Sequence, residues 1–156
     1  MAKEVKIGKI AIGGDNPVAI QSMISVPSTD IEGSVKQAVE LEKAGCEILR
    51  AAIPDMAAVE LIPAIKEKID IPLVADIHFD YRLALAAVEN GIDKIRINPG
   101  NIGSEERTRQ VVEACGNAGV AIRVGVNGGS LDKRLLEKYG APTAEALAES
   151  AMEHVA

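Results

Sequence analysis

A repeated alternation of short β-branched runs and amphipathic helical segments limits the folds open to this chain. From residue 17 to the end, each apolar run is followed by a turn with polar residues or glycine, and then by a segment of helical periodicity. Strands and helices that alternate in this way form a parallel sheet with right-handed crossovers. The runs begin 21 to 29 residues apart, the length of one strand–helix unit and its return. The predicted strands are 18–23, 47–53, 73–77, 94–98 and 121–127.

Polar residues mark the predicted starts of the helices. Thr29 stands three residues before a glutamate, the spacing of a capping box. Pro63 lies inside the second predicted helix and should kink or shorten it, because proline has no N–H to donate. Residues 5–17 predict a short β-hairpin, with Gly13 and Gly14 in or near a turn. The other helix starts are predicted at Asp55, Asp80, Ser104, Ser130 and Thr143.

Two architectures accommodate five strand–helix units. One is a five-stranded doubly wound sheet, which suits a complete protein of 156 residues. The other is the first five-eighths of a (β/α)8 barrel, whose usual length is about 250 residues. The chain stops inside an apparent helix without a terminating glycine, which favours the barrel, although an ordinary C-terminal helix can end in the same way.

Composition excludes several classes of function. Asp and Glu outnumber Lys and Arg by 23 to 17, and the formal net charge of −6 disfavours an extended surface for nucleic acid or anionic membranes. With two tyrosines, one phenylalanine and no tryptophan, base-stacking platforms are not expected. No apolar run is long enough to span a bilayer, and we expect a cytoplasmic protein. Cys46 and Cys115 lack the spacing of a metal cage, so we expect two buried thiols and no metal site.

Polar side chains concentrate at the C-terminal ends of the predicted strands, where ligands bind in both architectures. Residues two or four apart on a strand share one face. Arg96 therefore lies on the same strand face as Asn98, and Arg123 on the same face as Asn127. In a barrel this shared face points inward over the mouth. The candidate site residues are Arg50, Asp76, His78, Arg96, Asn98, Asn101, Arg123 and Asn127.

Three of these candidates are arginines on neighbouring strands, and their mutual repulsion is unfavourable unless an anion lies between them. Guanidinium groups match phosphate oxygens bidentately. Two glycine-containing loops, at residues 98–103 and 127–130, each lead to a helix start and can offer backbone N–H groups to the same oxygens. The predicted ligand is therefore small and carries two or more negative charges, most simply a phosphate or a diphosphate.

Each assignment has a structural alternative. A single arginine near a strand end often forms a surface ion pair, and Asp76 could simply pair with Arg50 or Arg96. His78 is either a packed or capping histidine or a general acid or orienting donor, for which its usual pKa range is suitable. Asp76 and His78 are the candidates for a catalytic role, and no catalytic residue is assigned.

Five segments, four of which carry these residues, resemble the 4-hydroxy-3-methylbut-2-enyl diphosphate synthase family of the non-mevalonate isoprenoid pathway. They run in order along nearly the whole chain, and ADIHFDYRLAL and RINPGNIG are long and specific. The segments are QSM at 21–23, AGCEILRAAIPDM at 44–56, PLVADIHFDYRLAL at 72–85, DKIRINPGNIG at 93–103 and IRVGVNGGSL at 122–131.

The resemblance implies a fold and a reaction. Family members have an N-terminal (β/α)8 barrel and a C-terminal domain with a [4Fe–4S] cluster, and they act as homodimers in which one barrel faces the partner's cluster. They reductively open 2-C-methyl-D-erythritol 2,4-cyclodiphosphate with electrons from ferredoxin or flavodoxin. By this resemblance the diphosphate is bound by Arg50, Arg96 and Arg123. The asparagines that would orient it are Asn98, Asn101 and Asn127. The arginines or the sugar hydroxyls would be held by Asp76 and His78.

The chain also departs from the family. Residues 24–29 differ from the usual TNT stretch, and the last barrel strands and the cysteine-bearing domain are absent. We therefore expect an α/β fold, a partial (β/α)8 TIM barrel of about five units after an N-terminal hairpin, with residues 1–156 as the N-terminal part of the barrel domain. Such a chain would supply part of the diphosphate site, would bind no [4Fe–4S] cluster and would be inactive alone.

Two other hypotheses stay open. A pterin-binding transferase barrel of the dihydropteroate synthase kind would use the same arginines for a pterin diphosphate. A non-catalytic half-barrel would instead self-associate, because two sheet edges and apolar surface would otherwise be uncovered. Selective binding of the cyclic diphosphate would distinguish the isoprenoid synthase hypothesis from both of these.

Overall fold

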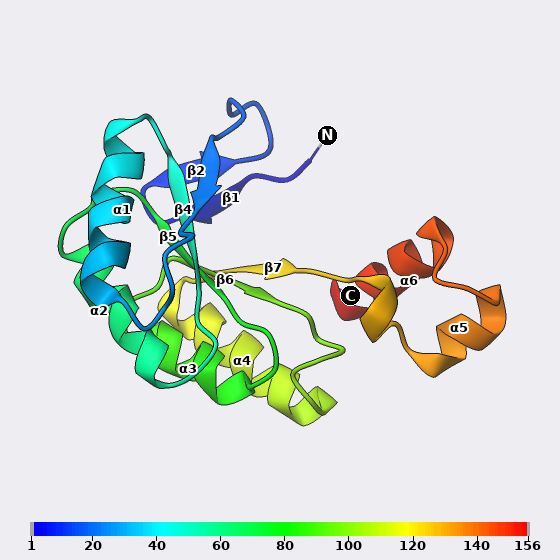
Figure 1. Cartoon of the computed structure of the whole chain (residues 1–156). Coiled ribbons are helices and arrows are strands. Elements are labelled where there is room, and N and C mark those ends of the chain that lie inside the picture. Colours follow the sequence, from blue (N-terminus) through cyan, green and yellow to red (C-terminus); the bar gives the residue numbers. More distant parts are fainter. Residues whose placement is uncertain (1, 156) are drawn as a thin grey trace.

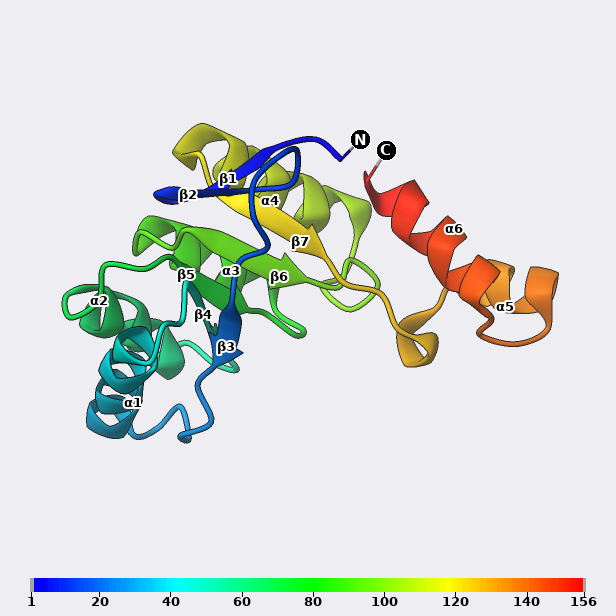
Figure 2. The ribbon, with the colours of Figure 1, turned by 90° about the horizontal axis from the view of Figure 1, so that it is seen from above.

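The computed structural model describes residues 2–155 and contains one five-stranded parallel sheet (Figures 1 and 2). The strands follow one another in sequence order across the sheet. A doubly wound fold has helices on both faces and a reversal of strand order, so the sequential order here is that of a barrel sector, as predicted. The strands are β3 (Gln21–Met23), β4 (Ile48–Ala52), β5 (Leu73–Asp76), β6 (Lys94–Ile97) and β7 (Ala121–Val124).

Four helices connect consecutive strands and cover one face of the sheet, while the last two project beyond the C-terminal end of β7 (Figure 1). The projecting pair has a small core of its own, in which Leu135 is fully buried with Leu131 and Ala146. No helix within residues 2–155 is long and apolar enough to cross a membrane. The helices are α1 (Ile31–Lys43), α2 (Leu61–Lys66), α3 (Tyr81–Glu89), α4 (Glu105–Ala118), α5 (Lys133–Tyr139) and α6 (Ala144–Val155).

Alternation along the strands separates an apolar outer face from an inner face that is apolar under the hairpin and polar towards the C-terminal ends of the strands. Leu49 and Ile95 belong to the main core between the sheet and the helices, and both are fully buried. Residues of the opposite parity project to the inner face. The Cα register aligns Asp76 with Arg96, and Arg96 with Arg123, so these three residues lie side by side on that inner face.

A β-hairpin covers the inner face at the N-terminal ends of the strands (Figure 2). It consists of β1 (Val5–Ile7) and β2 (Ile10–Ile12), paired in antiparallel register. Ile7 is fully buried and packs with Ile48 and Val74 of the sheet. The hairpin therefore closes the lower end of the barrel sector and leaves the upper end for the polar residues.

Strand and turn boundaries differ from the predicted ones in detail. Each strand is shorter than predicted, and β3 begins at Gln21 because Val18 is 95% exposed and unpaired. The predicted helix over Pro63 is divided into a 3₁₀ turn (Ala57–Glu60) and the short α2, so the shortening is confirmed. The hairpin turns between β1 and β2, and Gly13 follows the second strand.

Two predicted N-caps are wrong. The cap of α1 is Asp30 rather than Thr29, because the Asp30 carboxylate accepts the helix N–H of Gly33 at 2.9 Å. The cap of α5 is Asp132 rather than Ser130. The Ser130 hydroxyl instead bonds to the loop that follows β6, a contact between residues distant in the sequence.

The parallel sheet ends at β3 on one side and at β7 on the other. Neither edge is paired further within the described part of the chain. Unpaired edges template association with another chain, so the expectation of a self-associating half-barrel stays a prediction.

Candidate functional site

Asp76 is the centre of the inner-face cluster. It is the last residue of β5, and its side chain is only 2% exposed. One carboxylate oxygen, Oδ2, accepts a hydrogen bond from Arg50 Nε at 3.2 Å and a second from Arg50 Nη2. Arg96 Nη1 lies 3.6 Å from the other oxygen, Oδ1, and His78 Nε2 lies 3.6 Å from Oδ2. The structure thus pairs Asp76 with both arginines that the sequence offered as alternatives.

The cluster carries more positive than negative charge. Asp76 is one carboxylate between two guanidinium groups, and its buried Oδ1 accepts no hydrogen bond from any residue in 2–155. Arg123, aligned with Arg96 on β7, is exposed, and its side chain has no hydrogen-bond or ion-pair partner among the described residues. The inner face therefore offers guanidinium charge that the residues described do not neutralise.

Gly125 sets the position of Arg96. A Cβ atom on Gly125 would lie 2.5 Å from Arg96 Nε and Nη2, so the guanidinium occupies the space that a side chain would need. The Gly125 amide donates to the Ile97 carbonyl at 2.8 Å, which holds this backbone beside β6. Glycine is required here for the close approach of an arginine to the main chain.

We expect Gly125→Ala to weaken binding of inorganic diphosphate by about tenfold or more, because one misplaced charge-assisted contact costs at least 1.4 kcal/mol. The methyl group displaces the guanidinium, which is the far end of a flexible side chain, so the fold should persist. Isothermal titration calorimetry measures the affinity. The matched control is Gly116→Ala on α4, where a Cβ meets open space. Equal affinity in both variants would show that Arg96 does not need its observed position.

The loops after β6 and β7 are joined by the predicted asparagines. Asn98, 2% exposed, donates from Nδ2 to Ser130 Oγ at 2.5 Å and accepts from the Gly100 amide at 3.0 Å. Asn127 Oδ1 accepts from the Ser130 amide at 3.1 Å and its hydroxyl at 3.2 Å. Asn101 donates its backbone N–H to the Asn98 carbonyl at 2.9 Å. These contacts fix the two loops against each other above the arginines.

His78 lies in the loop beyond β5 and is the accessible member of the Asp76 cluster. Its side chain is 46% exposed, so water or a ligand reaches the imidazole. The neighbouring Phe79 ring is 6.1 Å from it, centroid to centroid, and is itself largely exposed. The histidine is neither packed in the core nor the cap of α3, which is Asp80. Its role as proton donor or orienting group stays a prediction.

Sequence reasoning missed Lys94. This residue begins β6 and is only 8% exposed, yet its side chain makes no hydrogen bond or ion pair within residues 2–155. Burial, reinforced by the charges of Arg123 and Arg50, holds the pKa of Lys94 below its usual value of 10.5. The parity of Lys94 with Arg96 was the available signal, because residues two apart share a strand face.

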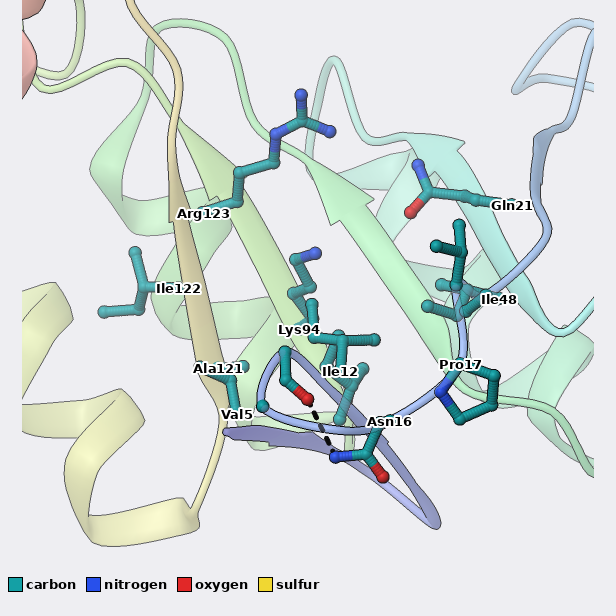
Figure 3. Close-up of a pocket in the computed structure, with 15 residues that line it drawn as sticks. Val5, Ile12, Asn16, Pro17, Gln21, Ile48, Lys94, Ala121, Ile122 and Arg123 are labelled. Atoms are coloured by element: carbon teal, nitrogen blue, oxygen red, sulfur yellow. Dashed lines mark hydrogen bonds between the residues drawn. The ribbon is translucent and has the colours of Figure 1, made fainter. Parts of the chain in front are cut away.

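Lys94 lines an open cavity of about 670 Å³ between the hairpin and the inner face of the sheet. Figure 3 shows the side chains of Lys94, Arg123 and Gln21 directed into the same space, above the apolar Ile12 and Ile48. The cavity thus has apolar residues of the hairpin and the sheet on one side, and two cationic groups, Lys94 at the start of β6 and Arg123 further along β7.

The described residues do not fit a metal ion or an iron–sulfur cluster. Within residues 2–155 no group of three or more His, Cys, Asp or Glu side chains could hold a metal. A [4Fe–4S] cluster needs several thiolates, whereas the sequence has two cysteines. Burial raises the pKa of the Cys115 thiol to about 11, so it stays protonated at neutral pH.

The family model of the GcpE TIM-barrel domain matches residues 2–156. The chain is 58% identical over 153 residues to the 4-hydroxy-3-methylbut-2-en-1-yl diphosphate synthase (flavodoxin) of Geobacillus kaustophilus, covering 98% of this chain and 41% of the relative. It is 59% identical to the protein of that name from Clostridium perfringens, covering 98% and 44%. The chain thus spans about two fifths of the length of these relatives.

Among solved structures, the dihydropteroate synthase of Xanthomonas albilineans superposes with a TM-score of 0.64 at 15% identity, over 99% of this chain and 61% of that one. The 7,8-dihydropteroate synthase of Vibrio fischeri gives a TM-score of 0.60 at 15% identity, over 98% and 62%. At such identities the likeness is one of fold alone.

Proposed function

The chain belongs to the GcpE TIM-barrel family, and from this we propose that it is the substrate-binding part of a flavodoxin-dependent 4-hydroxy-3-methylbut-2-en-1-yl diphosphate synthase. Residues 1–156 would then be the N-terminal part of a barrel domain that continues in the longer relatives. The substrate would be 2-C-methyl-D-erythritol 2,4-cyclodiphosphate, as the family resemblance implies.

One observation carries this proposal: the inner face holds Arg50 and Arg96 against the single carboxylate of Asp76, and carries Arg123 and Lys94 on the neighbouring inward positions. A chain with a net charge of −6 places this excess of positive charge on the inner face of its sheet. Guanidinium groups bind phosphate oxygens bidentately, so a diphosphate is the small ligand that suits the site.

The contacts of each residue suggest its role in binding the substrate. Arg123, which has no partner in the described chain, and Arg96, held over Gly125, would bind the diphosphate oxygens. Asp76 would keep Arg50 and Arg96 in position. His78, accessible and 3.6 Å from Asp76, would donate a hydrogen bond or proton to an oxygen of the substrate.

Reductive ring opening also needs two electrons, which this chain cannot store. In the longer protein a [4Fe–4S] cluster, reduced by flavodoxin or ferredoxin, would supply them, and the cysteines for it would lie outside this segment. A homodimer in the cytoplasm, with each barrel facing the partner's cluster, is part of the same proposal. The segment alone would bind the substrate without reducing it.

Calorimetric titration of the chain with three ligands tests the proposal. We expect the cyclic diphosphate to bind in the micromolar range, about −8 kcal/mol, and 6-hydroxymethylpterin diphosphate to bind at least tenfold more weakly. The neutral parent sugar, 2-C-methyl-D-erythritol, is the control for binding without charge. Tighter binding of the pterin would favour the transferase hypothesis, and no binding of either diphosphate would favour the non-catalytic half-barrel.

A further inference from the structure

Lys94 is a largely buried residue whose ammonium group has no counter-charge. The residue is 8% exposed and lines the open cavity, and no acceptor among residues 2–155 is within hydrogen-bond distance of its side chain. Holding an ammonium group where protein displaces much of its hydration, without an anionic partner, is costly. A ligand that supplied the counter-charge would offset this cost.

The surrounding strands offer Lys94 no anion. Its register partners are Val74 on β5 and Ala121 on β7, both apolar. The charges that reach it are those of Arg50 on β4 and Arg123 on β7, and both repel it. Asp76, two residues beyond Val74, is already paired with Arg50 and Arg96.

The side chain of Lys94 points into the same cavity as that of Arg123. Lys94 is two residues before Arg96 on β6, on the same face of the strand, and its side chain is directed towards the space below Arg123 (Figure 3). Between them, Lys94 and Arg123 provide two positive charges that no described residue neutralises. A ligand with two or more negative charges at this place would neutralise both.

We propose that Lys94 is a fourth anion-binding residue of the site, which contacts the diphosphate from inside the barrel while Arg96 and Arg123 contact it from the mouth. The proposal rests on the proposed function, because it takes a diphosphate as the ligand. It adds a residue that selects ligands by their number of negative charges, because a ligand with fewer negative charges would leave the charge of Lys94 without a partner.

The test is to replace Lys94 with methionine, which has a similar unbranched length and no charge. We expect Lys94→Met to weaken binding of inorganic diphosphate at least tenfold in calorimetric titration. The same variant should be more heat-stable, with a melting temperature about 2–5 °C higher, because a poorly hydrated and unpaired charge has been removed. Gain of stability with loss of affinity is the signature of a binding residue, and a residue with a purely structural role would not give it.

Lys36→Met on the exposed surface of α1 is the matched control and should change neither quantity. Lys94→Met with affinity within twofold of the unmodified chain would overturn the proposal, and so would a lower melting temperature, which would reveal a structural partner. If the unmodified chain binds diphosphate and Lys94→Met binds it equally, only this inference fails. If the unmodified chain binds no diphosphate, the proposed function fails with it.

Discussion

Asp76→Asn should lower the free energy of unfolding by about 3 kcal/mol, because removing one member of a buried ion pair leaves its partners uncompensated. Asp76 is 2% exposed, whereas the side chains of Arg50 and Arg96 are 23% and 18% exposed. Water therefore reaches the arginines in part, which places the loss at the lower end of the range for buried pairs. A lower urea midpoint with an unchanged denaturant slope would show the loss.

Asp70→Asn is the matched control for this substitution. Asp70 is exposed, and its side chain makes no hydrogen bond within the described residues. The same chemical change there should stay within about 0.5 kcal/mol of the unmodified chain. Equal midpoints for the two variants would mean that water solvates the arginines when Asp76 is absent. Asp76 would then not stabilise the cluster.

Strand parity and the position of strand ends were sufficient to predict most of the inner-face cluster. Arg96 is level with Asp76, and Arg50 lies one inward position lower, level with Val74, so residues of one parity on three parallel strands come together. This geometry follows from local sequence once the sheet is parallel. The choice between a barrel and a doubly wound sheet depends on strand order, which the sequence pattern alone left open.

The burial of Lys94 could not be predicted from local sequence, although its parity with Arg96 places it on the inner face. Ile7 of β1 packs on the inner face of the sheet, and the hairpin lines the same open cavity as the lysine. A lysine at the start of a strand otherwise looks like an ordinary exposed residue. The same limit explains Ser130, whose hydroxyl contacts Asn98 across two loops instead of beginning a helix. Contacts between segments distant in sequence decided both cases.

Arg123→Met should weaken binding of the cyclic diphosphate by about 10- to 100-fold, because a hydrogen bond to a charged group contributes about 1.5–3 kcal/mol. Arg123 is exposed and has no partner within residues 2–155, so its charge is available to a ligand without breaking an existing contact. The free energy of unfolding should therefore change by no more than about 0.5 kcal/mol. Calorimetric titration and urea denaturation of the same variant measure the two quantities.

Arg109→Met on α4 separates a specific contact from the general loss of positive charge. Arg109 is exposed and lies 3.7 Å from Glu105 on the outer surface. Its loss changes the net charge equally, but salt screens its effect on the ligand, and affinity should fall less than about twofold. The two main variants should then differ in what they lose. Arg123→Met should lose affinity for the diphosphate at nearly unchanged stability, whereas Asp76→Asn should first of all lose free energy of unfolding. Equal affinities of the two arginine variants would mean that the diphosphate does not contact Arg123, and the proposed site would have to exclude β7.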